Sequence, residues 1–73
     1  MKLILSNAII NLDRIVSIYV EDGTLRLERD DAAYIVKNIP SDALQQIAVA
    51  YAQGKAYIEL DGILSMEDTD GNQ

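Results

Sequence analysis

The side chains that most often carry out catalysis are missing from this sequence. The 73 residues include no cysteine and no histidine. A chain without cysteine has no thiol nucleophile, thiolate metal site or disulfide. Histidine is the commonest metal ligand and the commonest proton shuttle near neutral pH, and it is the usual base for a serine nucleophile. The composition argues against an enzyme, and we predict no catalytic residue, no cofactor and no metal site.

The paired carboxylates of the sequence lie where solvated charges are expected. General acid–base catalysis needs two carboxylates around a cleft, with pKa values that their surroundings push apart. The pairs here are Glu21-Asp22, Asp30-Asp31 and Glu67-Asp68. Each falls in a predicted turn or in the C-terminal segment, so we interpret them as surface charge.

Two short phrases resemble fragments of ligand-binding loops. A phosphate loop ending in Gly54-Lys55 would need a glycine at position 49, which is Val49, so this phrase is better explained as the end of a helix. Residues 68–72 alternate oxygen-bearing side chains as a calcium loop does, but that loop needs an acidic residue at its twelfth place. The sequence given ends at Gln73, and an acidic tail is the expected structure.

The charge balance argues against two classes of partner. The chain has six basic and twelve acidic residues, a formal net charge of −6, and the basic residues form no cluster. Nucleic acids and anionic membranes both require clustered positive charge. No apolar run reaches the roughly 20 residues of a membrane-spanning helix, and the run after Lys2 is too short for a signal peptide. We therefore expect a cytoplasmic protein.

The first 40 residues show the alternation of β-strands. Residues 2–5 and 8–12 form one bent strand or a small hairpin, and residues 14–20 place Val16, Ile18 and Val20 on one predicted core face. The pair Asp22-Gly23 then predicts a tight hairpin turn, because both positions tolerate a positive φ. Strands at 24–28 and 32–37 follow.

A single helix is predicted over residues 41–53. Ser41 is a favourable N-cap, Gly54 suits a left-handed C-cap, and Leu44, Ile47, Ala48 and Tyr51 share one face at helical spacing. A strand at 56–60 and a terminal hairpin to residue 66 complete the chain. The predicted class is α+β, with a twisted antiparallel sheet of about four to six strands and helix 41–53 packed on one face. Residues 1–66 form the domain and 67–73 a disordered acidic tail.

The face of the predicted sheet that the helix does not cover is unusually apolar. It carries Ile9, Ile15, Tyr19 and Tyr57, although such a face is usually polar and tyrosine is enriched at interfaces. Isolated apolar residues are also common on surfaces, and a one-residue change of register would make this set the core. We predict an interaction surface here, together with the acidic residues Glu21, Asp22, Asp30 and Asp31.

The order of features resembles two groups of short bacterial proteins. The matching phrases are Asn11-Leu12-Asp13, Ile18-Tyr19-Val20, Asp22-Gly23, Ala43-Leu44, Ile47-Ala48 and Gly54-Lys55-Ala56-Tyr57-Ile58-Glu59. Over residues 1–60 the sequence looks like small uncharacterised proteins of phages and mobile elements, which have a β-meander, one helix and a returning strand. Residues 11–51 also resemble FlbD-type flagellar proteins. The first resemblance implies a fold and a genomic setting, without any residue-level activity.

These observations favour a non-enzymatic protein-binding module that forms a homo-oligomer, since a domain this small without disulfides gains stability by association. One form of it is a phage-encoded inhibitor that presents its acidic residues to a basic surface of a host defence protein. One alternative is an orphan structural subunit. The other is an oligomer that sequesters a nucleotide with Arg14, Arg26 and Arg29.

Overall fold

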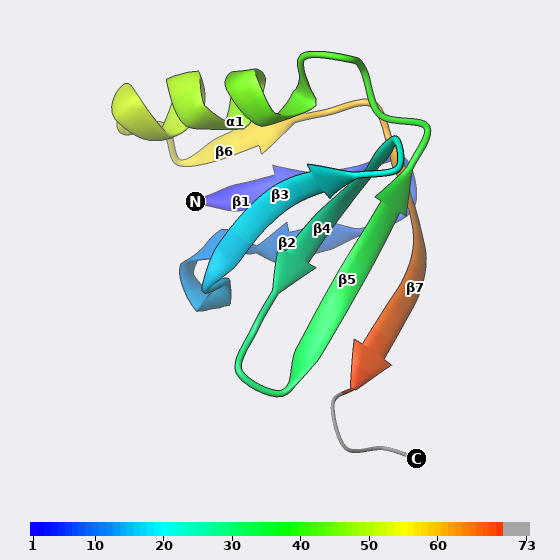
Figure 1. Cartoon of the computed structure of the whole chain (residues 1–73). Helices are drawn as coiled ribbons and strands as arrows, with labels where there is room; N and C mark the ends of the chain where they lie inside the picture. Colours follow the sequence, from blue (N-terminus) through cyan, green and yellow to red (C-terminus); the bar gives the residue numbers. More distant parts are fainter. Residues whose placement is uncertain (70–73) are drawn as a thin grey trace.

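The computed structural model describes residues 1–69 and contains seven strands, one α-helix and one 3-10 turn within them (Figure 1). In chain order the elements are β1 (Lys2–Ile4), β2 (Ile9–Asn11), η1 (Leu12–Arg14), β3 (Ser17–Glu21), β4 (Thr24–Glu28), β5 (Ala32–Lys37), α1 (Ala43–Ala52), β6 (Tyr57–Glu59) and β7 (Ile63–Thr69). This arrangement confirms the predicted α+β class with a single helix among the described residues.

The strands divide between two sheets, which the sequence patterns did not reveal. One sheet has three strands in the order β2-β1-β6, and the other has four in the order β3-β4-β5-β7. All neighbouring strands are antiparallel except β1 and β6, which are parallel. Each strand alternates apolar and polar residues in the same way whichever sheet it joins, so periodicity alone does not assign strands to sheets.

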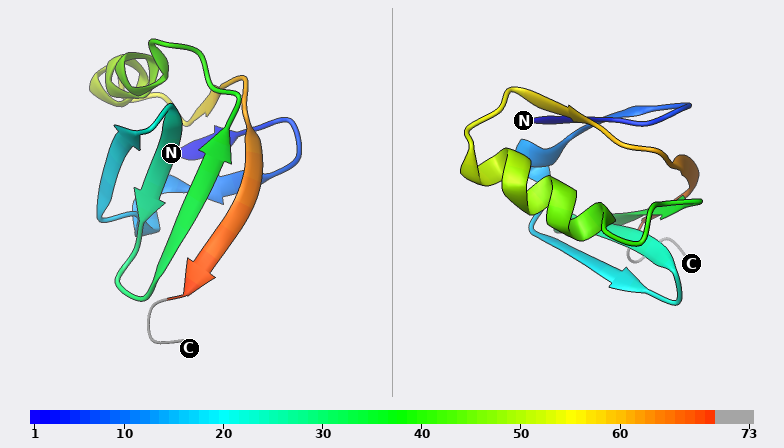
Figure 2. Two further views of the ribbon diagram at one scale, coloured as in Figure 1. Left: turned by 45° about the vertical axis from the view of Figure 1, so that its right-hand side comes forward. Right: turned by 90° about the horizontal axis from the view of Figure 1, so that it is seen from above.

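The hydrophobic core lies between the two sheets. Leu3 of β1 and Leu25, Leu27 and Val36 of β4 and β5 are fully buried there, and Ile47 of the helix closes the core from one side. The view from above shows α1 between the β6 side of the smaller sheet and the β3 side of the larger one (Figure 2). The helix thus covers the opening between two end strands.

The β3–β4 hairpin has the predicted turn. Asp22 has a φ of 52° and Gly23 a φ of 75°, the left-handed conformations that a two-residue hairpin turn requires. The register places Ile18 opposite Leu27 and Val20 opposite Leu25, on the face that the buried leucines share. Of the three predicted core residues, only Ile18 packs against the core, whereas Val16, which precedes β3, and Val20 are exposed.

Helix α1 (Ala43–Ala52) begins two residues later than the predicted helix 41–53 and ends one residue earlier. Asp42, not Ser41, occupies the N-cap position, and it makes no side-chain bond to the free N–H groups of the first turn. At the other end Gly54 has a φ of 69°, and the Lys55 N–H donates to the Ala50 carbonyl at 3.1 Å. This is the Schellman arrangement expected of a glycine that follows a helix.

The helix buries a face that shares only Ile47 with the predicted one. Ala43, Ile47 and Ala50 are the buried residues, whereas Leu44 and Tyr51 are exposed. Alanine and other apolar residues surround α1 on almost every side, so helical periodicity identifies the helix without selecting its inner face. Small side chains allow it to approach the two sheet edges closely.

The chain passes from the smaller sheet to the larger one at Gly62. A Cβ atom added to this buried glycine would lie 2.8 Å from Val36 Cγ1, closer than packed atoms tolerate. Strand β7 then continues to Thr69, beyond the predicted domain boundary at residue 66. The rest of the predicted tail, residues 70–73, lies outside the described residues.

Candidate functional site

The four apolar residues predicted to share one outer face lie on different parts of the molecule. Ile9 and Tyr57 are both on the outer face of the three-stranded sheet, with 67% and 55% of their surfaces exposed. Tyr19 is on the outer face of the four-stranded sheet, opposite Arg26. Ile15 packs against the core. Of the four residues, only Ile9 and Tyr57 therefore share a sheet face, and β1 lies between their strands.

Tyr19 belongs to a polar network within its own sheet. Its hydroxyl donates a hydrogen bond to Glu28 Oε2 at 2.6 Å, and the guanidinium of Arg26 lies 6.0 Å from the ring centroid. The hydrogen bond to Glu28, followed by desolvation, raises the pKa of Tyr19 above its ordinary value of 10.0. These contacts account for a tyrosine at this position without any partner.

The acidic pairs lie at opposite ends of one strand. Glu21 and Asp22 are at the turn before β4, whereas Asp30 and Asp31 are at the turn after it. A strand of five residues spans roughly 17 Å. Glu21 and Asp31 also approach arginines of this chain, at 4.0 and 3.5 Å. The four carboxylates form two separate clusters that are partly neutralised.

The three arginines named for nucleotide binding do not converge on one site. Arg14 and Arg29 line a cavity of about 140 Å³ together with Tyr34, whose hydroxyl accepts a hydrogen bond from Arg29 Nη1 at 3.1 Å. Arg26 lies on the outer face of the four-stranded sheet, 3.9 Å from Glu28. Sites for drug-sized ligands are usually about 300–1,000 Å³, so this cavity within one chain is smaller than such a site. The predicted nucleotide site between subunits stays a prediction.

An apolar hollow lies between α1 and the start of β3, where the sequence predicted buried side chains. It has a volume of about 510 Å³, and Val16, Leu44, Ala48 and Tyr51 are among the residues that line it. Val16 is 69% exposed and Tyr51 76% exposed, and Val20 farther along β3 is also exposed. We call Val16, Val20, Leu44, Ala48 and Tyr51 the α1–β3 surface.

The strand beside this hollow has a free edge. β3 is the end strand of its sheet, and its outer edge pairs with no other strand among residues 1–69. Natural proteins usually protect such an edge with lysine, proline or inward-pointing charge. β3 contains none of these, and its single charged residue, Glu21, lies at its end.

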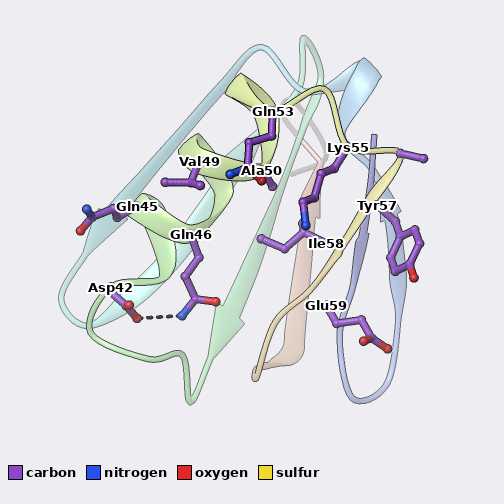
Figure 3. Close-up of a pocket in the computed structure, with 11 residues that line it drawn as sticks. Asp42, Gln45, Gln46, Val49, Ala50, Gln53, Lys55, Tyr57, Ile58 and Glu59 are labelled. Carbon is purple, nitrogen blue, oxygen red and sulfur yellow. Dashed lines mark hydrogen bonds between the residues drawn. The ribbon is translucent and has the colours of Figure 1, made fainter.

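A second groove runs between the other side of α1 and β6 (Figure 3). Its volume is about 860 Å³, and Ala50 of the helix and Ile58 of β6 contribute apolar surface to it. Gln46, Gln53 and Lys55 add polar groups, and the Gln46 amide donates to Asp42 Oδ1 at 2.8 Å. We call this the α1–β6 groove.

The backbone of β6 also has an open edge, and this edge faces away from β1. The Ala56 carbonyl and the Leu60 N–H both bond to β1, each at 3.0 Å. Backbone groups of alternate residues point to opposite sides of a strand, so those of Tyr57 and Glu59 point away from β1. β6 is the end strand of its sheet and pairs with no other described strand on that side.

Sequence reasoning missed both grooves, although each left a signal. The glutamines were the only polar residues of the helix after Asp42, and they mark the side that lines the α1–β6 groove. Leu44, Ala48 and Tyr51 formed the apolar stripe that was assigned to the core. An apolar stripe on a helix predicts that this face packs against other residues, but it does not show whether those residues belong to the same chain.

Chemical features of other kinds are few in the part of the chain that the structure describes. Residues 1–65, whose side chains the structure describes, contain no group of three or more histidine, cysteine, aspartate or glutamate side chains placed to hold a metal ion. The ten-residue α1 is too short to cross a membrane, and the described residues offer no longer apolar helix.

Comparisons with family models, curated proteins and solved structures found no match to this chain. The resemblances to phage proteins and to FlbD-type proteins stay predictions.

Proposed function

We propose that this chain is a non-catalytic protein-binding module that self-associates through the α1–β3 surface. The observation that supports this proposal is that exposed apolar residues of α1 lie next to exposed apolar residues at β3. Leu44, Ala48 and Tyr51 on the helix and Val16 just before β3 line one hollow, although their spacing is that of core residues. Val20, farther along β3, is exposed as well.

The α1–β3 surface has the composition of an interface core. Among the residues that line its hollow, Asp13 is the only charged side chain, while aliphatic and aromatic residues predominate. The centres of interfaces are depleted in charge and enriched in aromatic residues. The surface is also built from a helix and a strand edge that are both rigid parts of the fold, which lowers the entropic cost of binding.

A second copy of the chain is the occupant that this surface fits best. A 73-residue domain without cysteine has a thin core, and association is the common way to compensate. A two-fold dimer uses the same patch on both partners, so an uncharged apolar patch is compatible with itself. Contact between two copies through their acidic turns would be unfavourable, because the chain has a net charge of −6 and like charges repel. The uncharged α1–β3 surface avoids this repulsion.

The proposal is tested by measuring molar mass in solution with light scattering or analytical ultracentrifugation. We expect a dimer for the unmodified chain and a monomer for Tyr51→Glu, because a buried carboxylate would have no partner in the interface. Tyr57→Glu is the matched control, since Tyr57 is another exposed tyrosine outside the α1–β3 surface.

Two results would contradict the proposal. One is an unmodified chain that stays monomeric at high concentration. The other is a dimer that Tyr57→Glu disrupts while Tyr51→Glu leaves it intact, since this would move the interface to the outer face of the three-stranded sheet. Circular dichroism of each variant shows whether the fold is retained, and Leu44→Glu replaces Tyr51→Glu if that variant does not fold.

A further inference from the structure

We infer that the α1–β6 groove binds an extended peptide segment that carries a carboxylate, and that the peptide adds to β6 as a new strand. This inference is independent of self-association, because it concerns the opposite side of the helix. It assigns the chain a ligand class in addition to its own second copy.

The first step of the argument is the unpaired backbone of β6. Tyr57 and Glu59 direct their N–H and C=O groups away from β1, toward the side on which α1 lies (Figure 3). A peptide in extended conformation presents N–H and C=O groups at the same spacing. Addition of a strand to an exposed edge is a recurrent mode of peptide recognition, in which the main chain provides much of the affinity.

The second step is the shape of the groove. Neighbouring strands lie about 4.8 Å apart, so an added strand needs a channel beside the edge and a wall to limit it. The channel of about 860 Å³ has β6 on one side and α1 on the other. Ala50 and Ile58 can receive an apolar side chain of the peptide, while the glutamine amides can bond to its polar groups.

The third step is the charge inside the groove. The Lys55 side chain extends toward Ile58 between the helix and the strand (Figure 3), and it makes no ion pair or side-chain hydrogen bond within residues 1–65, the part of the chain whose side chains the structure describes. Asp42, the N-cap of α1 and another residue of the groove lining, accepts a hydrogen bond from Gln46 Nε2. The Glu59 side chain points away from the helix (Figure 3). An anionic group on the occupant would therefore pair with Lys55, and in a peptide that group is a carboxylate.

The test begins with selection of random linear peptides on a display library against the whole chain. Selected peptides should contain an acidic residue or end in a free carboxylate. Their affinity should fall about tenfold for Lys55→Gln, the effect of losing one charge-assisted hydrogen bond. Replacement of the peptide's acidic residue by its amide should have the same effect, and should have little further effect on the Lys55→Gln variant.

Strand addition is tested separately from charge. Methylation of the peptide backbone nitrogens at alternate positions should abolish binding in one register and be tolerated in the other, because only every second N–H faces β6. Glu59→Pro removes an edge-facing donor without touching the bonds to β1, so it should weaken binding at least tenfold, while Glu59→Ala should not. If Glu59→Pro does not fold, the peptides with methylated backbone nitrogens decide the question on the unmodified chain.

Several outcomes would overturn the inference. A selection that enriches no peptide would contradict it, as would selected peptides without an acidic group that bind as tightly as those with one. Binding that is insensitive to backbone methylation, or that requires a helical peptide, would equally contradict strand addition. Binding lost in Tyr51→Glu but kept in Glu59→Pro would place the peptide on the α1–β3 surface. Because Tyr51→Glu removes the proposed dimer without altering the groove, it separates this inference from the proposed function.

Discussion

The side-chain amide of Asn7 forms two hydrogen bonds with the backbone of Leu64. Asn7 Nδ2 donates to the Leu64 carbonyl at 3.0 Å, and the Leu64 N–H donates to Asn7 Oδ1 at 2.9 Å. Asn7 lies in the turn between β1 and β2, whereas Leu64 belongs to β7 of the other sheet. The Asn7 amide thus bonds to both backbone groups of Leu64, as a residue of a neighbouring strand would. It joins two sheets that have no strand pairing between them.

Replacement of Asn7 by alanine should lower the free energy of unfolding by about 1–2 kcal/mol, because both bonds are lost and the Leu64 groups must find water. Urea unfolding monitored by circular dichroism measures this change. Ser6→Ala in the same turn is the control, and its effect should stay within about 0.5 kcal/mol. Equal stability of the two variants would show that the amide pair contributes nothing.

The corner at Gly62 should not accept a side chain. An added Cβ would meet Val36 Cγ1 at 2.8 Å, and Leu5 Cδ2 and Ile39 Cγ2 at 3.3 Å. Overpacking of this kind typically costs about 1–3 kcal/mol, so Gly62→Ala should be destabilised by that amount. Thermal unfolding of Gly62→Ala beside Asp61→Ala, an exposed neighbour, measures the difference. A Gly62→Ala variant as stable as the unmodified chain would mean that the corner can move.

Tyr19 should make stability sensitive to alkaline pH. The hydrogen bond to Glu28 raises the pKa of Tyr19 above 10.0, so the folded state favours the neutral phenol. The contribution of this hydrogen bond to the free energy of unfolding is fully present below about pH 10, the pKa of Tyr19 in the unfolded chain. It is lost as the pH rises through the higher pKa of Tyr19 in the folded chain.

Urea unfolding of the unmodified chain and of Tyr19→Phe, from neutral pH to about pH 11, tests this expectation. The advantage of the unmodified chain over the variant should shrink as the phenol ionises. Tyr57→Phe is the control on the other sheet. A difference between the unmodified chain and Tyr19→Phe that does not change with pH would show that the bond to Glu28 does not persist in solution.

Self-association through the α1–β3 surface should make the melting temperature depend on protein concentration. A dimer that forms only from folded chains stabilises them by mass action, so the melting temperature should rise with each tenfold increase in concentration. The melting temperature of Tyr51→Glu should be independent of concentration. Scanning calorimetry over a wide concentration range gives both results, and parallel behaviour of the two proteins would argue against this interface.

Local features of the fold could be predicted from the sequence because they depend on nearby residues. The hairpin turn requires a positive φ at two adjacent positions, and Asp22-Gly23 provides it. Gly54 ends the helix for the same reason. The assignment of strands to two sheets could not be predicted, because it depends on β1 pairing with β6 across more than 50 residues of sequence.

The candidate sites were harder to predict than the elements that form them. Leu44 and Tyr51 have the spacing of core residues, and only the packing of Ala43, Ile47 and Ala50 against the sheets shows that the other stripe is uncovered. The α1–β6 groove depends on which edge of β6 is free, a property of sheet order. The scattered basic residues gave no sign that Lys55 would extend into a groove.

The parallel pairing of β1 with β6 also determines when the chain can fold. Leu3, fully buried in the core, lies beside Ile58, so its place is complete only after β6 has been synthesised. The β3–β4 hairpin is local and can form within about 1–10 μs, whereas closure of the long loop between β1 and β6 is slower. On the ribosome β1 therefore waits with its apolar side chains exposed until β6 has emerged. Translation that pauses between the helix and β6 should leave a chain that depends on a chaperone and aggregates without one.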